Sequence, residues 1–373
     1  MGYVAIQGGE QAIAQAAQLM TRIRTQGAEN GELPISLEAI QHQLHFLLSV
    51  VLSEGGLYDP QLAALAIKQS VGDPLEAAFY VRAYRCTRSR ILETPPQDTS
   101  KMRLIRRISA AFKEVPGGQM LGPTPDYTQR LFNLELIDET PEAFREAFRK
   151  SLPQSDLDDF PTNVPKVIDF LRQQGLVAPL SPSDDDPFDI TRQPIIFPLP
   201  RSGMLSIMSR ANTGSILAMA YSNMRGYGTV HPTVAELRVG YLPVELPHPV
   251  TSEPTQVGEV LMTECEIVSS YEAEDDKKPM FQLGYGACFG HNESKAISMA
   301  ILDRALQHGI KHGPNAPSED PEFVLLHIDG VDSMGFCVHY KMPHYVTFQS
   351  NLDRLRATQE KHQEQPNTEE VVM

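Results

Sequence analysis

Residues 284–306 read GYGACFGHNESKAISMAILDRAL, and within them the apolar period changes from that of a strand to that of a helix. The glycine-rich part extends the segment FQL before it, and we predict a strand over residues 281–290. From Asn292 onward apolar residues recur every three or four positions, so a helix follows at once. A strand that leads directly into a helix indicates an α+β region.

Further periodic segments extend this region in both directions. Strands are predicted over residues 215–222, 235–246, 258–271, 322–328 and 335–340, and a helix is predicted over residues 346–362. Residues 201–362 should therefore form an α+β domain with a mixed or antiparallel sheet, and residues 363–373 a flexible tail.

The first part of the chain, residues 1–132, is predicted to be helical. Ser36 precedes an apolar run over residues 37–52, and Asp59 and Asp73 are each followed by proline, a strong signal for a helix start. A further basic helix is predicted over residues 101–115.

An acidic, proline-rich insertion over residues 133–200 separates the two regions. It contains two short helical patterns, over residues 140–152 and 164–176, but proline and aspartate at this density disfavour continuous sheet. We expect it to be peripheral and the part of the chain least suited to carry chemistry.

Composition limits the classes of function. The 373 residues carry a net charge of -15, which argues against nucleic-acid binding driven by phosphate neutralisation. No apolar run is long enough for a membrane helix, and residues 1–10 lack a secretory signal, so we expect a cytoplasmic protein without membrane contact. The four cysteines lack CxxC spacing, which argues against a disulfide framework.

Two carboxylates, Glu264 and Glu266, fall on one face of the strand predicted over residues 258–271. Met262 and Val268 share that face, so the carboxylates should meet cations, a metal or a substrate hydroxyl. Such a pair can act as acid and base or stabilise an oxocarbenium-like centre. The alternative is a solvated outer face of an edge strand.

The loop SNMRGYGTVHP, residues 222–232, has the composition of an anion-binding loop. Arg225 offers a fixed positive charge, the backbone at Gly226, Tyr227 and Gly228 can approach a phosphate, and His231 can transfer a proton. Short glycine motifs are weak signals, and these glycines would equally serve a turn between strands.

Two further segments could bind anions. The free amide groups at the helix start near Asn292 form one candidate, although helix capping explains Asn292 better. In the predicted basic helix, Arg103, Arg106 and Arg107 would share one face and suit a polyphosphate. Pairing with the acidic insertion or with another subunit is the alternative for these arginines.

Two histidines, His339 and His344, flank the dipeptide Met342-Pro343. Proline bends the chain, so the two rings can converge on one metal ion. They provide at most half of a tetrahedral zinc site. Cys337 would share the strand face of His339, and a purely structural role for both histidines stays open.

Taken together, these segments resemble the PhnI family, subunit I of the carbon-phosphorus lyase core complex. The resemblance is carried, in order, by residues 8–13, 54–73, 102–131, 225–232, 258–268, 284–306 and 335–349. It covers most of the chain outside the insertion and the tail.

The resemblance implies a role in bacterial phosphonate use. Members of this family take part in displacing adenine from ATP by a phosphonate such as methylphosphonate, which gives alpha-D-ribose 1-methylphosphonate 5-triphosphate, and act alone as purine nucleosidases. The implied partners are subunits G, H and J of the core complex, subunit L, and the ABC-type subunit K. By resemblance, His339 and His344 bind a zinc ion that a partner subunit shares.

Two other functions stay open from the residues. A noncatalytic scaffold would use the same glycines and carboxylates to order subunit contacts, with the histidine pair pinning the radical-enzyme partner. A freestanding nucleoside hydrolase would need an aspartate cluster for calcium and ribose, which the sequence lacks.

Overall fold

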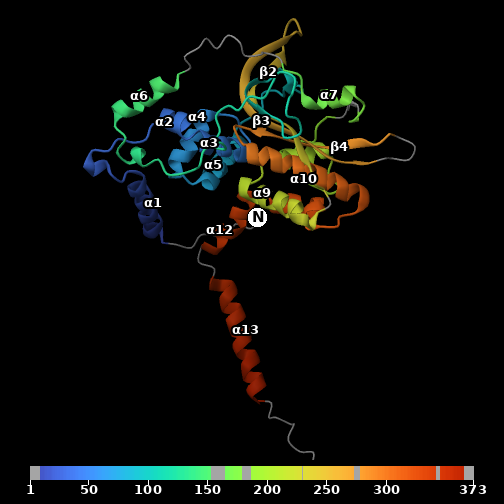
Figure 1. Cartoon of the computed structure of the whole chain (residues 1–373). Helices are drawn as coiled ribbons and strands as arrows, with labels where there is room; N and C mark the ends of the chain where they lie inside the picture. Colours follow the sequence, from blue (N-terminus) through green and yellow to red (C-terminus); the bar gives the residue numbers. More distant parts are fainter. Residues whose placement is uncertain are drawn as a thin grey trace, which may run out of the picture. The chain divides into compact units, whose positions relative to one another are not determined.

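The computed structural model describes residues 9–152, 164–178, 186–228, 230–272, 278–341 and 345–364. It divides into a unit of Ile35–Asp329 and a smaller unit of Met1–Pro34 with Gly330–Met373. The larger unit combines helices with one antiparallel sheet, so the predicted α+β class is confirmed (Figure 1).

Four helices form a small bundle at the start of the larger unit. They are α2 (Leu37–Gln43), α3 (His45–Gly55), α4 (Pro60–Gln69) and α5 (Pro74–Cys86). As predicted, side chains cap three helix starts: Ser36 accepts from Ala39 N, Asp59 from Leu62 N, and Asp73 from Leu75 N and Glu76 N. The single helix predicted over residues 37–52 is broken at Leu44.

The sheet has four strands in the order β1-β2-β3-β4, and every pair is antiparallel. The strands are β1 (Arg103–Ile108), β2 (Thr233–Pro247), β3 (Pro254–Glu272) and β4 (Met280–Phe289). The strands predicted over residues 235–246, 258–271 and 281–290 are thereby confirmed. Of the described strands, β3 is internal, since β2 and β4 pair with its two edges.

Helix α10 (Glu293–His312) packs on one face of the sheet, against β3 and β4 (Figure 1). A Cβ atom on Gly284 would lie 2.1 Å from the carbonyl oxygen of Ala300, and one on Gly286 would lie 2.1 Å from that of Ala296. Only glycine permits this close approach of helix to strand. Helices α8 (Arg201–Ser209), α9 (Thr213–Ser222) and α11 (Pro321–His327) complete this layer around the main core.

Three predicted strands are wrong, because residues 215–222 lie in α9, residues 322–328 fall largely in α11, and residues 335–340 are also helical. A short apolar run does not distinguish a buried strand from a buried helix. The caps carried the missing information: Asn212 accepts from Ser215 N, and Asp320 accepts from Phe323 N ahead of Pro321.

The basic helix predicted over residues 101–115 is also wrong, since residues 103–108 form β1 against β2. Strand alternation sends Arg106 and Arg107 to opposite faces of the sheet, where both are buried. They therefore do not form the shared cationic surface that helical spacing predicted.

The insertion contains α6 (Pro141–Ser151) and α7 (Val167–Gln173), as its two helical patterns predicted. Side chains of α7 pack in a second core with Ala235, Val268 and Leu283. This part of the insertion therefore covers the sheet face that α10 leaves open.

The smaller unit contains α1 (Glu10–Arg24), α12 (Gly330–Val338) and α13 (Tyr345–Glu364), and the helix predicted over residues 346–362 is confirmed. Short helical turns link elements of the whole chain: η1 (Ala28–Asn30), η2 (Thr99–Lys101), η3 (Leu134–Asp138), η5 (Asn223–Tyr227), η6 (Pro317–Glu319) and η7 (His339–Lys341). Of the predicted tail, residues 365–373 lie outside the described residues. In the described part of the chain, no helix combines the length and the apolarity needed to cross a membrane.

Candidate active site

Charged side chains gather on the sheet face that α7 covers. In the antiparallel register Glu236 of β2 lies opposite Glu266 of β3, and Arg238 lies opposite Glu264. Lys166, at the start of α7, reaches both carboxylates of β3. The two glutamates share one strand face and meet cations, as the alternation predicted. The alternative of a solvated edge strand is wrong, because β3 is internal and Glu264 is only 1% exposed.

Glu264 is held by donors from three segments. Its Oε1 atom lies 2.8 Å from Lys166 Nζ and accepts hydrogen bonds from Thr99 Oγ1 at 2.7 Å and from the Tyr285 hydroxyl at 2.9 Å. Burial on its own raises the pKa of Glu264, but Lys166 and the hydrogen bonds outweigh burial and hold this pKa below its usual value. Glu264 is therefore ionised at neutral pH.

Glu266 has a different environment two residues further along the strand. Its Oε1 atom lies 3.3 Å from Lys166 Nζ. Burial raises the pKa of Glu266 to about 7; Lys166 opposes this shift, and the charge of Glu264 adds to it. Near neutral pH the pair thus combines one ionised carboxylate with one that exchanges a proton.

Arg238 lies beside this pair with its guanidinium group 1% exposed. Its NH1 atom is 3.7 Å from Glu264 Oε2, and none of its three nitrogens has a hydrogen-bond partner among the described residues. The Oε2 atoms of Glu264 and Glu266 are likewise without a hydrogen bond in that part of the chain. Buried polar atoms without partners are costly, so this cluster has donors and acceptors to offer a polar ligand.

A cavity of about 830 Å³ reaches residues next to the cluster, although no side chain of the cluster itself lines it. Ala287, the β4 residue paired with Glu264, and Met262 line it from the same sheet face. Its other walls come from α3, α8 and the segments of residues 90–94 and 187–191. These walls carry Arg90 and Arg210 together with Glu93 and Asp189, and Arg90 pairs with both of these carboxylates. The volume is in the range of cavities that hold drug-sized ligands.

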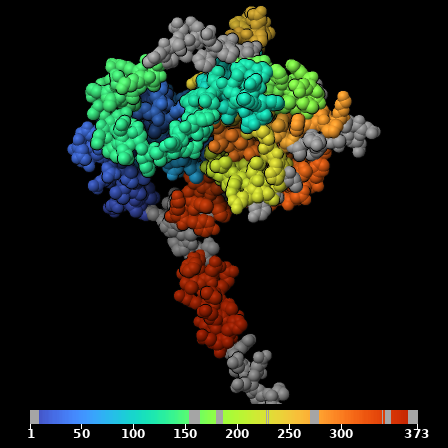
Figure 2. All heavy atoms as spheres, viewed as in Figure 1, coloured from blue at the N-terminus to red at the C-terminus, as the bar shows by residue number. Residues whose placement is uncertain are grey.

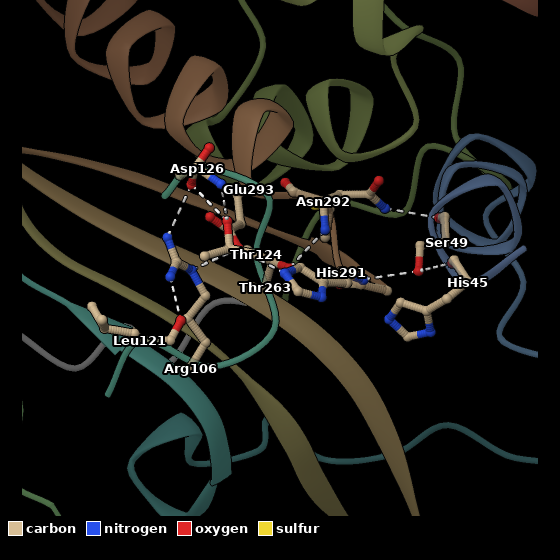
Figure 3. Close-up of polar contacts among 12 residues, drawn as sticks. His45, Ser49, Arg106, Leu121, Thr124, Asp126, Thr263, His291, Asn292 and Glu293 are labelled. Carbon is tan, nitrogen blue, oxygen red and sulfur yellow. Dashed lines mark hydrogen bonds and ion pairs between the residues drawn. The ribbon is translucent and has the colours of Figure 1, made fainter. Parts of the chain in front are cut away.

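A smaller cavity of about 450 Å³ lies at the start of α10. Asn292 occupies the N-cap position, as predicted, but its side chain makes no capping hydrogen bond. Its amide group donates instead to Ser49 O at 2.8 Å (Figure 3) and to Phe289 O at 2.7 Å. Beside it, Glu293 Oε1 lies 2.6 Å from His291 Nε2 and 2.8 Å from Arg106 Nε (Figure 3). Arg106 is therefore a buried partner of the helix start.

The side chain of Arg107 is held by one carboxylate and three backbone carbonyl groups. Its Nε atom pairs with Glu236, and its other nitrogens donate to the carbonyl oxygens of Pro116, Gly118 and Pro165 at 2.7–2.9 Å. It ties the loop after β1 and the insertion to the sheet. Four of its five N–H groups are used in this way and the side chain is buried, so it is not available for the phosphate that we predicted.

The loop before β2 lies away from the carboxylates. Arg225 is exposed and donates to the Tyr221 hydroxyl, while Gly226 has a φ of 100° inside the turn η5. The backbone of Gly228 donates to Asn223 O, and the side chain of Tyr227 lies outside the described residues. The exposed His231 lies before β2, five residues ahead of the partner of Glu266 and seven ahead of the partner of Glu264, or roughly 17 and 23 Å along an extended chain. The structure therefore does not bring His231 to the predicted carboxylate pair.

The predicted metal ligands cannot be placed, because the side chain of His339 and the whole of His344 lie outside the described residues. Cys337 lies in the last turn of α12 and His339 begins η7, so the backbone here is helical. Residues two apart on a helix point to different sides, so the shared strand face that we predicted for them is wrong. Among the described residues, no group of three or more histidine, cysteine, aspartate or glutamate side chains could hold a metal ion.

The sequence did not predict the four residues that lie against the carboxylate pair and complete the cluster: Thr99, Lys166, Arg238 and Tyr285. Strand alternation alone would have placed Arg238 and Tyr285 opposite the two glutamates. No sequence pattern indicates Thr99 or Lys166, since both reach Glu264 from segments about a hundred or more residues away.

Fold and site together define an α+β protein with a buried acid–base pair beside a cavity of ligand size. Residues 2–362 match the family model described as "Bacterial phosphonate metabolism protein (PhnI)". The chain belongs to this family.

Three relatives agree with the family. A Stutzerimonas stutzeri protein, named as a candidate C-P lyase subunit, HtxH, is 63% identical over 99% of both chains. The alpha-D-ribose 1-methylphosphonate 5-triphosphate synthase subunit PhnI of Escherichia coli K12 is 44% identical over 96% of this chain and 98% of its own. The protein of the same name from Rhizobium meliloti 1021 is 41% identical over 96% and 95%.

Proposed function

We propose that this chain is a subunit of the synthase that the two PhnI relatives are named for. In this reaction a phosphonate such as methylphosphonate displaces adenine from ATP and gives alpha-D-ribose 1-methylphosphonate 5-triphosphate. Alone, the chain releases the purine base to water. The observation that carries the proposal is the pair Glu264 and Glu266, whose pKa values are shifted in opposite directions.

Glu264 suits the stabilisation of the reacting ribose. As the bond between C1′ and the purine nitrogen breaks, its electron pair leaves with the base, and positive charge grows on the sugar. An ionised carboxylate in a buried site stabilises that charge strongly, because its hydrogen bonds are already formed and the local dielectric constant is low.

Glu266 suits the transfer of a proton. With a pKa of about 7 it holds a proton part of the time at neutral pH, and it can donate this proton to the leaving purine. The phosphonate monoanion or water then bonds to C1′ through oxygen, and the proton that it loses restores the carboxyl group. This role replaces the one that we predicted for His231.

Arg238 suits the binding of the phosphonate. Its buried guanidinium group comes from β2, opposite Glu264 on β3. The nitrogens of this group have no hydrogen-bond partner among the described residues. A guanidinium group binds tetrahedral oxyanions through two parallel hydrogen bonds. A phosphonate held there would present an oxygen beside the carboxylate pair.

Assembly with partner subunits is part of the proposal. Between β1 and α6, residues 131–137 expose several large apolar side chains, with Phe132 95% exposed. This green-coloured part of the chain lies at the surface in the space-filling view (Figure 2). Exposed apolar clusters are typical of protein interfaces. Subunits G, H, J and L, and the ABC-type subunit K, are the proposed partners.

Zinc belongs to the same proposal. His339 and His344 would supply two of its ligands, and a partner subunit would complete the site. A bound zinc ion would supply a Lewis acid or a structural link between chains.

A noncatalytic scaffold is the second candidate function. The near-complete burial of Glu264 favours it, since a substrate reaches this carboxylate only if neighbouring side chains move. In this interpretation the cluster joins α7 to the sheet, and the histidine pair links the chain to its radical-enzyme partner.

Purine release from ATP and GTP by the isolated full chain separates the two functions. We expect release by the native chain and a loss of at least about a hundredfold in Glu264→Gln, as for the removal of one group that stabilises a transition state. Glu259→Gln is the matched control, because Glu259 is a partly exposed glutamate of the same strand, paired with Arg103. Full activity of folded Glu264→Gln and Glu266→Gln variants, or no activity of the folded native chain, contradicts the proposed catalytic role.

A further inference from the structure

A fully buried lysine lies on the other side of β4 from the carboxylate pair. Lys295, in the first turn of α10, is 0% exposed. Its Nζ atom donates to Ser53 Oγ at 2.7 Å, and no carboxylate of the described residues lies within ion-pair distance of it. Ser53 Oγ in turn donates to the carbonyl oxygen of Ser209 at 2.8 Å.

The environment of Lys295 is poor for a positive charge. Burial lowers the pKa of Lys295 to about 8. The nearby carboxylates are engaged elsewhere: Glu54 accepts from Thr213 and Asn212, and Asp329 pairs with Arg82 at 2.8 Å. A neutral serine hydroxyl compensates a desolvated ammonium group only in part. An anion placed against Ser53 and Lys295 would supply the missing counter-charge.

Ser53 connects this lysine to the larger cavity. Ser53 and Cys288 line the 830 Å³ cavity on the α10 side of β4, and Ala287 lines it on the side of Glu264. Because successive strand residues point to opposite faces, the cavity follows the edge of β4 and meets both faces. A ligand in this cavity can therefore contact Ser53 at one end and reach Ala287, the β4 residue paired with Glu264, at the other, although no side chain of the carboxylate cluster lines the cavity.

We propose that Ser53 and Lys295 form the subsite for the triphosphate end of a nucleotide in this cavity. The Ser53 hydroxyl turns from Ser209 O to a phosphate oxygen, and the ammonium group of Lys295 stabilises the added negative charge through its hydrogen bond to Ser53. Arg90 and Arg210 line the same cavity, together with Glu93 and Asp189, the two carboxylates that pair with Arg90. The identity of the ligand as a nucleotide rests on the proposed function; the anion subsite does not.

Titration calorimetry of the full chain with inorganic tripolyphosphate tests the subsite without any reaction. We expect Ser53→Ala and Lys295→Met to bind about tenfold to a hundredfold more weakly, as for hydrogen bonds to charged groups. Lys311→Met is the matched control: it removes the same charge from the exposed end of the same helix and should bind as the native chain does.

The outcomes separate this subsite from the proposed chemistry. The Glu264→Gln variant should still bind tripolyphosphate although it no longer releases the base. If the native chain binds tripolyphosphate but releases no base, only the proposed function is contradicted. Absent binding of tripolyphosphate to the native chain overturns the subsite, as does unchanged binding in Ser53→Ala. Thermal unfolding verifies that each variant folds. If Lys295→Met does not fold, the binding of tripolyphosphate to Ser53→Ala tests the subsite.

Discussion

The ammonium group of Lys166 lies 2.8 Å from Oε1 of Glu264, although 98 residues separate them in sequence. The same group lies 3.3 Å from Glu266. One cation from the insertion therefore lowers the pKa values of both carboxylates, against the effect of burial, which prevails at Glu266. The acidic, proline-rich segment that looked peripheral supplies the charge on which the acid–base pair depends.

The contribution of Glu266 to stability should fall as the pH rises from about 4.5 to 7. The pKa of Glu266 is raised from 4.5 to about 7, so the folded state binds more protons than the unfolded state in this window. The stabilisation is complete below the unfolded pKa and is lost as the pH passes the folded pKa. The loss is on the order of 3 kcal/mol. Urea unfolding of the native chain and Glu266→Gln at a series of pH values measures it. Parallel curves for the two proteins contradict the assignment.

Removal of the Lys166 charge should destabilise the fold. Lys166→Met leaves Glu264 as a buried carboxylate with a weakened cationic environment, and breaking a buried ion pair typically costs about 3–5 kcal/mol. The double variant Lys166→Met/Glu264→Gln should recover part of the loss, because the uncompensated charge is then absent. Chemical unfolding of the four proteins gives the coupling free energy. A coupling near zero shows that the pair is energetically unimportant.

The contact between β4 and α10 should not tolerate a methyl group. Gly286→Ala places a Cβ atom 2.1 Å from the Ala296 carbonyl oxygen, and forced overpacking costs about 1–3 kcal/mol or more. Gly258→Ala on β3 is the matched control, because a Cβ atom there meets nothing within 4 Å. A calorimetric melting temperature that falls equally in both variants rules out the contact as the cause.

Zinc content should depend on His339 in the assembled complex. Metal analysis of the complex purified with its partner subunits should show one zinc ion fewer per chain in His339→Ala than in the native complex, because a half-site of two histidines cannot retain the metal after losing one. His362→Ala, which changes a histidine near the end of α13, is the control. Unchanged zinc in His339→Ala would falsify the shared site.

Local signals predicted much of the fold. The Asp-Pro helix starts at Asp59 and Asp73, the three long strands and α10 all follow from caps and periodicity within a few residues. Residues 215–222 were misassigned because an unbroken apolar run hides the helical period: Ile216 and Ala220 are buried, whereas Leu217 and Tyr221, equally apolar, are exposed. Residues 103–108 were misassigned because pairing with β2 overrides the helical spacing of three arginines.

The candidate site was only partly predictable, for a related reason. Glu264 and Glu266 follow from the alternation of one strand, and their need for cations follows from burial. The cations themselves come from β2 and from the start of α7, and only the tertiary fold brings these segments together. The role expected of Arg107 failed because its partners, Glu236 and three carbonyl groups, were invisible in the local sequence.

Alternate residues of strand β4 have different roles, because they point to opposite faces of the sheet. Gly284 and Gly286 let α10 pack closely against β4, because any larger side chain at either position would collide with the helix. Tyr285 and Ala287, which alternate with them, face the carboxylate cluster and the cavity. The side chains at positions 285 and 287 can therefore change without disturbing the packing of α10 on β4, so the two faces of this strand can vary independently of each other.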